Sequence, residues 1–179
     1  NKLGFNEKKQ PFANAGVMIN RNVASGKGVA NYDGKYIYLK NILLTEDKVS
    51  EEFFIPDDEL AKWTYLKGPK NLIKTSKTGH KYPYSEGQVT FPDALDRASR
   101  TVITGEGGKS PSRFKHVVKT KSGRFRRLTP YELEKLNMFP GSLTKMKGVS
   151  DGRRAFFMGN ALVVGVIEKI GKSLLKEIP

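Results

Sequence analysis

The sequence contains no cysteine, which excludes a disulfide scaffold, a cysteine-ligated zinc site and a thiolate nucleophile within these 179 residues. No apolar run approaches the roughly 18 residues that a membrane-spanning helix needs, and the residues 1–4 (NKLG) show no signal-peptide core. Acidic residues are scarce, because 18 Asp and Glu stand against 32 Lys and Arg, which gives a net charge of +14. This excess predicts a polyanionic partner, with nucleic acid first and an anionic membrane surface second.

The positive charge is concentrated in two stretches of the chain. Residues 62–81 contain six lysines and no acid, and residues 97–127 contain ten Lys or Arg and one acid, Glu106. Seven acidic residues gather instead in 46–59. The second basic stretch is interleaved with Gly, Ser, Thr, Phe and His, a composition that suits loops meeting a phosphate backbone better than an amphipathic membrane helix. A merely solvated basic surface is the simpler alternative.

Hydrophobic periodicity and turn residues predict an α+β fold rich in loops and large enough to bury a core. A capping box over 129–132 predicts a short helix that stops at 139–141 (FPG), and one or two helical turns are expected over 57–63. A terminal amphipathic helix is expected to begin near Asn160 and to need a partner for its apolar stripe. Short strands are expected at 16–19, 36–39, 101–104, 114–118 and 125–128.

The patterns that carry chemistry are weak. The run 105–110 (GEGGKS) looks like a phosphate loop, but Ile103 stands where the template requires glycine and Pro111 blocks the following helix. His80 and His116 have no third metal ligand spaced beside them, and no nucleophile elbow is present. The glycines are instead expected to let loop 105–108 project and approach another backbone closely. The residues alone indicate a nucleic-acid-binding surface and no reaction centre.

The segment 126–140 (RRLTPYELEKLNMFP) and a second segment, 157–171, then resemble motifs IX and X of the DNA (cytosine-5)-methyltransferases, in the right order and at about the right distance. In the second, 157–171 (FMGNALVVGVIEKIG), the Gly-Asn-Ala of motif X falls at 159–161, with Leu162 where valine is commoner. Upstream, 100–103 and the glycines of 105–108 resemble the end of the family's target-recognition domain. The resemblance covers 97–176, and 1–96 are assigned to the recognition domain by position alone. In the first segment, 126–140, the matching residues are Arg126 or Arg127, Leu128, Thr129, Glu132, Leu136, Phe139 and Pro140.

The resemblance implies a mostly β target-recognition domain over 1–143, and a segment over 144–179 whose helix would pack on an α/β catalytic domain. The family's Pro-Cys nucleophile motif, its Glu-Asn-Val motif and its S-adenosylmethionine-binding strand-turn-helix do not occur in this sequence. The chain is therefore expected to be the C-terminal portion of such an enzyme, inactive alone, as its start at Asn rather than Met also hints. The expected setting is a bacterial restriction-modification system in the cytoplasm, on the DNA of the nucleoid.

The resemblance also implies residue roles. The expected partners are double-stranded DNA and the N-terminal catalytic part of the enzyme, with no membrane, no metal ligand and no catalytic residue in this chain. Asn160 and Ala161 are expected to border the S-adenosylmethionine site, and Arg113 to contact a guanine edge. The alternatives are a stand-alone nucleic-acid-binding module without activity and a basic structural or assembly protein. The expected DNA-contacting residues are Arg97, Arg100, Thr101, Gly105, Glu106, Gly107, Gly108, Lys109, Arg113, Lys115 and Arg126.

Overall fold

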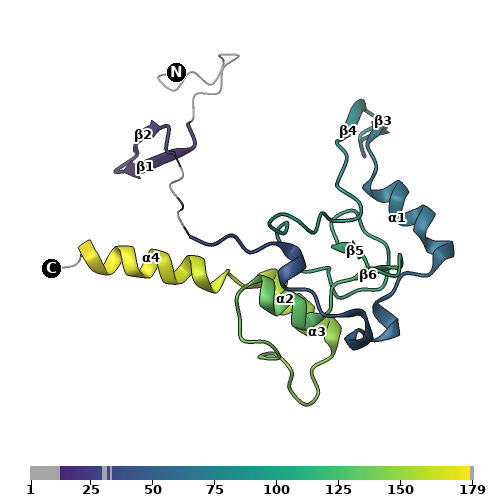
Figure 1. Ribbon diagram of the computed structural model, residues 1–179. Helices are drawn as coiled ribbons and strands as arrows, with labels where there is room; N and C mark the ends of the chain where they lie inside the picture. Colours follow the sequence, from purple (N-terminus) through teal and green to yellow (C-terminus); the bar gives the residue numbers. More distant parts are fainter. Residues whose placement is uncertain (1–12, 30–31, 33, 178–179) are drawn as a thin grey trace. The chain divides into compact units, whose positions relative to one another are not determined.

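A computed structural model describes residues 13–29, 32 and 34–177. The chain divides into two compact units, 1–35 and 36–179, and each is described by itself (Figure 1). The expected boundary at 143/144 falls inside the second unit and stays a prediction. No helix within the described ranges is long and apolar enough to span a membrane.

The first unit contains a β-hairpin. Strand β1 (Ala15–Ile19) pairs antiparallel with β2 (Asn22–Gly26), which confirms the strand expected at 16–19 and adds a partner that the sequence did not reveal. The two loop residues Asn20 and Arg21 both have positive φ, 47° and 64°, the left-handed conformation that matches the twist of a two-residue hairpin. Every residue of both strands is exposed.

The second unit is a small mixture of helices and short strands (Figure 1). Its helices are α1 (Leu60–Lys67), α2 (Pro130–Leu136), α3 (Asp151–Asn160) and α4 (Val164–Glu177). Its strands form two antiparallel ladders, β3 (Lys70–Thr75) with β4 (Lys81–Glu86) and β5 (Val117–Lys119) with β6 (Phe125–Arg127). Single 3-10 turns occupy Leu39–Asn41, Glu46–Lys48, Glu51–Phe53 and Asp57–Glu59.

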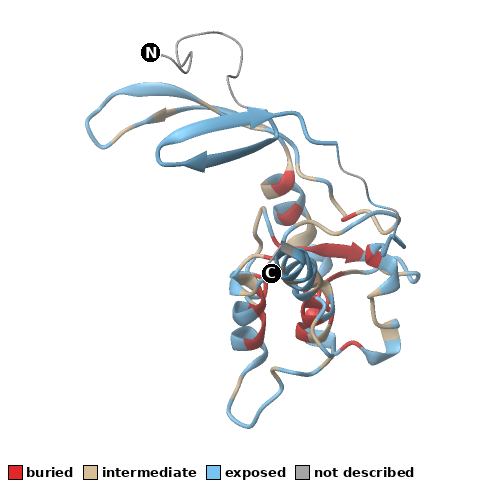
Figure 2. Cartoon of the chain, turned by 90° about the vertical axis from the view of Figure 1, so that its left-hand side faces the viewer, coloured by how far each residue is buried: buried red, intermediate tan, exposed pale blue. Residues whose placement is uncertain are grey.

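The core of this unit lies around β5, β6, α2 and α3, as the buried segments in Figure 2 show. A second, smaller cluster joins Ile55 and Val117 to Trp63 of α1. No strand of the described chain belongs to a sheet larger than two strands, so the mostly β character expected from the sequence is not confirmed. The main cluster consists of Leu39, Val102, Val118, Leu128, Leu133, Ala155 and Met158.

Several expected elements are present. The turns over 57–63 extend into α1, and the strand at 125–128 is β6. Of the strand expected at 114–118 only the last two residues are extended, as part of β5. Helix α2 begins with the expected capping box, in which the Glu132 amide donates to the Thr129 hydroxyl and the Thr129 amide to the Glu132 carboxylate.

Other expectations were wrong. Residues 36–39 and 101–104 are not strands, since Leu39 opens a 3-10 turn and the 103–104 backbone packs directly against Gly159, where a Cβ would lie 2.2 Å from the Thr104 nitrogen. The β3–β4 hairpin lies where no strand was expected. Helix α3 was not expected, and Ala161 adopts an extended conformation that ends it. The terminal helix therefore begins at Val164 rather than near Asn160.

A buried ion pair joins β6 to α2. The Arg126 guanidinium donates from Nη1 and Nη2 to the two oxygens of Glu132, at 2.9 and 2.7 Å, and both side chains are almost fully buried. The same carboxylate accepts the Leu44 amide at 2.8 Å. Arg126 was expected to contact DNA, and the structure instead gives it this internal partner.

Replacing Glu132 by glutamine is expected to lower the free energy of unfolding by about 3–5 kcal/mol, because the Arg126 charge would remain buried without its counter-charge. Glu168→Gln is the matched control. It breaks an exposed pair with Lys172 and should change stability by no more than about 0.5 kcal/mol. Urea denaturation of the unsubstituted chain and the two variants measures both changes in the free energy of unfolding. Equal losses for Glu132→Gln and Glu168→Gln would contradict the buried Arg126–Glu132 pair.

Candidate nucleic-acid interface

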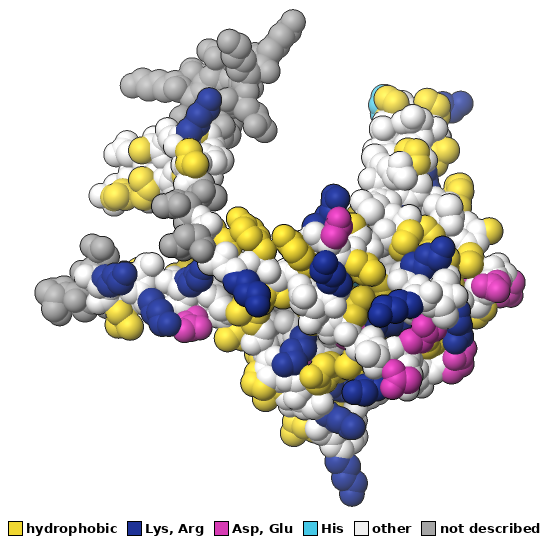
Figure 3. All heavy atoms as spheres, viewed as in Figure 1, with side chains coloured by type: hydrophobic (Ala, Val, Ile, Leu, Met, Phe, Trp, Pro, Cys, Tyr) yellow, Lys and Arg dark blue, Asp and Glu magenta, His cyan; other side chains and the backbone are white. Residues whose placement is uncertain are grey.

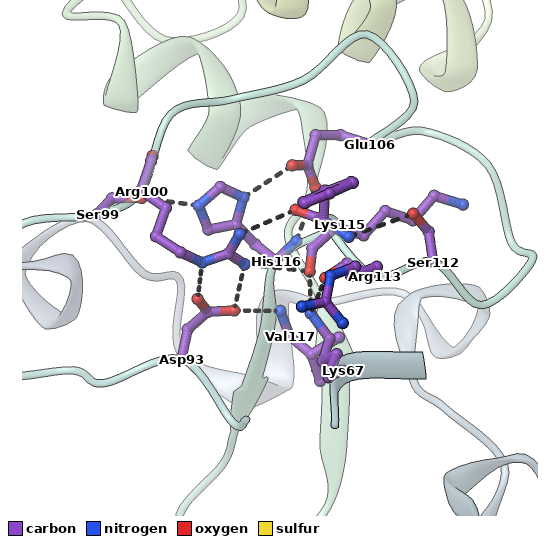
Figure 4. Close-up of polar contacts among 11 residues, drawn as sticks. Lys67, Asp93, Ser99, Arg100, Glu106, Ser112, Arg113, Lys115, His116 and Val117 are labelled. Carbon is purple, nitrogen blue, oxygen red and sulfur yellow. Dashed lines mark hydrogen bonds and ion pairs between the residues drawn. The ribbon is translucent and has the colours of Figure 1, made fainter. Parts of the chain in front are cut away.

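The glycine-rich loop 105–108 is held from inside by Glu106. This carboxylate is 2% exposed and accepts the backbone amide of His116 at 3.0 Å. Its other oxygen lies 2.8 Å from His116 Nδ1, while His116 Nε2 lies 3.0 Å from the Ser99 hydroxyl (Figure 4). His116 has no exposed surface, so this serine–histidine–glutamate chain connects three segments and offers no imidazole to a substrate.

Two further contacts fix the same loop. The Lys115 ammonium donates to the carbonyls of Gly108 and Ser110, both at 2.6 Å, and the side chain is buried. Burial lowers the pKa of Lys115 from its ordinary value, and the Arg127 charge adds to this effect. Gly107 packs on the first turn of α3, because a Cβ there would lie 2.7 Å from the Gly152 Cα. The loop therefore packs against the body instead of projecting, and Glu106, Gly107 and Lys115 serve its fixation.

Arg100, expected at a phosphate, is paired inside the protein (Figure 4). Its Nε and Nη2 donate to the two oxygens of Asp93 at 2.6 and 3.1 Å, and Nη1 donates to the Phe114 carbonyl at 3.1 Å. Asp93 in turn accepts the Val117 amide at 2.8 Å. The pair thus joins the 93–100 segment to the start of β5.

Arg113, expected at a guanine, binds backbone carbonyls. Its Nη1 donates to Leu66 and Gly68 at 3.1 and 3.0 Å, and its Nη2 donates to Gly87. Glu86 lies 3.2 Å from Nη1. Both terminal nitrogens of the guanidinium are therefore engaged at the base of the β3–β4 hairpin, and its contact with a guanine stays a prediction.

Lys67, at the end of α1, lies beneath this arrangement (Figure 4). It is 1% exposed, and its ammonium donates to the Lys115 and Arg113 carbonyls at 2.5 and 3.3 Å. Burial lowers the pKa of Lys67 from 10.5 to about 8. Its charge is stabilised by carbonyl dipoles and by the aromatic faces of Trp63 and Phe91.

The remaining expected residues of this region face solvent. Thr101, Gly105 and Gly108 are exposed, and the Arg97 and Lys109 side chains are 73% and 74% exposed. Each of these two cations has only a loose acidic neighbour at 3.7 Å, Asp96 and Glu52 respectively. Lys109 also lines a cavity of about 580 Å³, together with both acidic and basic side chains. The charge around Lys109 is therefore mixed in sign.

The junction between α3 and α4 brings motif X to the end of α2. A cavity of about 380 Å³ is lined by Gly159 and Ala161, by 99–102 and by 135–138. The terminal helix was expected to begin near Asn160, but this residue is the last of α3, and its exposed side-chain amide donates to the Phe156 carbonyl at 3.0 Å. The glycine of the motif is required by the adjacent 103–104 backbone.

Sequence reasoning missed the residues that organise this region. Lys67, Asp93 and Ser99 belong to no recognisable motif, and His116 was considered only as a metal ligand that lacks further ligands beside it. The one feature of the sequence that could have indicated this buried network was Glu106, the single acid among ten basic residues. An isolated acid in a basic stretch is a natural internal counter-charge, and here it is buried.

The Lys67 contact predicts an unusual pH dependence. Folding lowers the pKa of the Lys67 ammonium from 10.5 to about 8. Above about pH 8 the folded state therefore loses a proton that the unfolded state keeps. Stability relative to a Lys67→Met variant should therefore rise with pH between these values, by at most about 1.4 kcal/mol per pH unit. Denaturation at a series of pH values tests this. A difference that stays constant above pH 8 contradicts the buried charge.

Comparison with known proteins places this geometry in a family. Residues 5–176 match the family model of the C-5 cytosine-specific DNA methylases. The type II methyltransferase M.Sau3AI of Staphylococcus aureus is 38% identical over 165 residues, which cover 92% of this chain and 38% of that protein. The chain thus spans well under half the length of this relative.

A solved structure of the Entamoeba histolytica methyltransferase EhMeth is similar in fold, with a TM-score of 0.54 and 18% sequence identity. The match covers 86% of this chain and 45% of that one. The match to the family model extends over nearly all of the sequence, well beyond the two motifs at its C-terminal end. This chain belongs to the C-5 cytosine-specific DNA methylase family.

Proposed function

We propose that this chain is the DNA-recognition part of a DNA (cytosine-5)-methyltransferase. The observation that carries the proposal is the combination of family membership with a net charge of +14 and no cysteine. A cytosine-5 methyltransferase needs a nucleophile, which this chain lacks in thiol form, and a surface that holds duplex DNA, for which the charge is suited. The similarity to a type II methyltransferase from a bacterium supports a place in a restriction-modification system, acting on DNA in the cytoplasm.

The contacts narrow the set of residues that would meet DNA. We assign Lys109 and Arg97 to phosphates, because their side chains are exposed and each has one acidic neighbour at 3.7 Å, and Thr101, Gly105 and Gly108 are exposed in the same region. Arg100, Glu106, Gly107, Lys115 and Arg126 are bound internally or packed, and act in this proposal by shaping the loop. Such a division is expected, because a recognition surface must be held rigid by contacts that never touch the ligand.

The proposal assigns part of the S-adenosylmethionine site to the α3–α4 junction. The exposed amide of Asn160 and the extended backbone at Ala161 offer polar groups of the kind that bind an amino acid or a nucleoside. They can form only one edge of such a site. The catalytic part of the enzyme would supply the rest, including the nucleophile, and the bound cofactor would supply the methyl group.

The same catalytic part is the proposed partner of α4. The apolar residues of this helix remain exposed, among them Ile167 and Ile170 at 44% and 52% and Leu174 at 60%. Burying such a stripe contributes about 25 cal/mol per Å² of apolar surface removed from water, so the helix gains from a neighbour.

This chain should bind duplex DNA with an affinity that falls steeply as salt rises, because phosphate contacts release counterions. Lys109→Ala should weaken binding to all sequences alike and reduce the slope of log K against log[salt] by about 0.9, the value for one phosphate contact. Lys172→Ala on α4 is the control of equal charge. Fluorescence anisotropy with a labelled duplex measures all three, and a salt-independent isotherm contradicts the proposal.

Alone, the chain should transfer no methyl group from S-adenosylmethionine to DNA. Transfer of tritiated methyl groups to duplex DNA is the measurement, first with this chain and then with the catalytic part of the enzyme added. Activity should appear only in the mixture, and Asn160→Ala should then raise the KM for S-adenosylmethionine more than that for DNA. Methylation by the purified chain alone would overturn the assignment.

A further inference from the structure

The β3–β4 hairpin is an exposed arm of the second unit (Figures 1 and 2). Within its strands only Lys70, Lys74, Tyr84 and Glu86 are even half-buried. Large apolar side chains stay in solvent, with Ile73 at 71% and Leu72 at 46% exposed. The arm therefore contributes little to the core, and stability alone gives no reason for its length.

The arm carries charge of one sign. Between Asn71 and Ser85 lie Lys74, Lys77 and Lys81 together with His80, and no acidic residue. The nearest acid, Glu86, stands at the base of the arm, where Lys70 at 3.0 Å and Arg113 at 3.2 Å neutralise it. On the face shown in Figure 3, the tip presents basic, histidine and apolar side chains and no acidic ones. A polyanion is the partner that this distribution fits.

The shape of the arm suits one particular polyanion. The major groove of B-DNA admits a two-stranded β-ribbon, and ribbon proteins place side chains of one face against the base edges. In the register of this hairpin Asn71 faces Ser85, and Ile73 faces Pro83, on the more exposed side. The Ser85 hydroxyl donates to the Asn71 side-chain oxygen at 2.7 Å, which leaves the Asn71 amide protons to donate to a base.

The base of the arm is rigid. Arg113 binds carbonyls on both sides of it, Leu66 and Gly68 before β3 and Gly87 after β4. The ammonium of Lys70 also donates to the Leu66 carbonyl, at 3.0 Å. At the tip, the Ser76 amide donates to the His80 carbonyl and the Gly79 amide to the Ser76 carbonyl, at 2.8 and 3.0 Å. A ribbon fixed at both ends loses little conformational entropy when it binds.

We infer that the β3–β4 hairpin is a ribbon that enters the major groove of duplex DNA, with Lys77 and Lys81 at phosphates and the Asn71–Ile73 face toward the bases. Arg113 is then a positioning residue that aims the ribbon and does not touch DNA. The inference rests on the proposed DNA-recognition function and adds a contact surface separate from the 97–110 region.

The first test removes charge from the tip. K77A/K81A should weaken duplex binding and lower the salt slope by about 1.8, since each phosphate contact contributes about 0.9. K172A/K176A on α4 removes the same charge elsewhere and should leave the slope within error. Equal slopes for the two double variants overturn the inference, while leaving the proposed function intact if the unsubstituted chain binds. Failure of the unsubstituted chain to bind any duplex overturns both.

The second test locates the groove. Because the chain has no cysteine, Thr78→Cys allows a photo-crosslinker to be attached at the tip alone. Crosslinking to a duplex should be suppressed by the major-groove ligand methyl green and not by the minor-groove ligand netropsin. A label at Lys176→Cys provides the control. Absence of a crosslink at position 78, or suppression by netropsin only, overturns the inference.

The third test concerns Arg113. Lysine keeps the charge but cannot span three carbonyls with a planar fork, so Arg113→Lys should loosen the arm. Affinity for duplex and crosslinking from position 78 should both fall, and trypsin should cleave faster at the arm's lysines, while the salt slope stays unchanged. A reduced slope would mean that Arg113 itself contacts phosphate, and unchanged affinity would mean that it does not aim the ribbon.

Discussion

The fold of the second unit depends on buried cations that are neutralised by groups of the same chain. The Arg126–Glu132 pair is the clearest case. One carboxylate binds the guanidinium twice, closes the capping box of α2 and accepts the Leu44 amide. Two charges in a dry interior are tolerable only when nearly every hydrogen-bonding position is filled, as it is here. The pair thereby fixes β6, the start of α2 and the 39–54 segment at one point, and the smaller contacts of the unit build on that arrangement.

The same principle explains how a chain of net charge +14 encloses a core. Asp93 neutralises Arg100, Glu134 neutralises Arg154, and Glu106 lies against His116, and all three of these acids are buried. Lys67 donates to backbone carbonyls, and its burial lowers its pKa to about 8 although the Asp93 charge acts in the opposite direction. Cations such as Lys115 and Arg127 are buried as well, so the interior takes up both signs of charge and the exposed surface keeps the basic character of the composition.

The sequence predicted the features that rest on local chemistry. The capping box at Thr129–Glu132, the hairpin strand at 16–19 and the helical turns before Lys67 follow from short-range spacing, and the structure has them. Helix α3 could not be predicted, because Gly152 and Gly159 lower its helix propensity. Both glycines are there for tertiary reasons, since the backbones of 107 and 103–104 pack directly against them. Nor could the sequence distinguish an arginine that contacts a ligand from one that contacts the fold. Arg113 donates to the Leu66 carbonyl, 47 positions away in the chain, and Arg100 donates to the Asp93 carboxylate, 7 positions away.

A guanidinium that joins the two ends of a hairpin makes the direction of that hairpin a property of the core, since the carbonyls it binds belong to α1's end and to the loop after β4. The ammonium of Lys67 reaches the Arg113 carbonyl from the same side. The exposed lysines at the tip can therefore vary without disturbing folding, while their placement is held by buried contacts. A recognition surface built in this way separates stability from specificity, because the residues that hold the arm are not those that would meet the DNA.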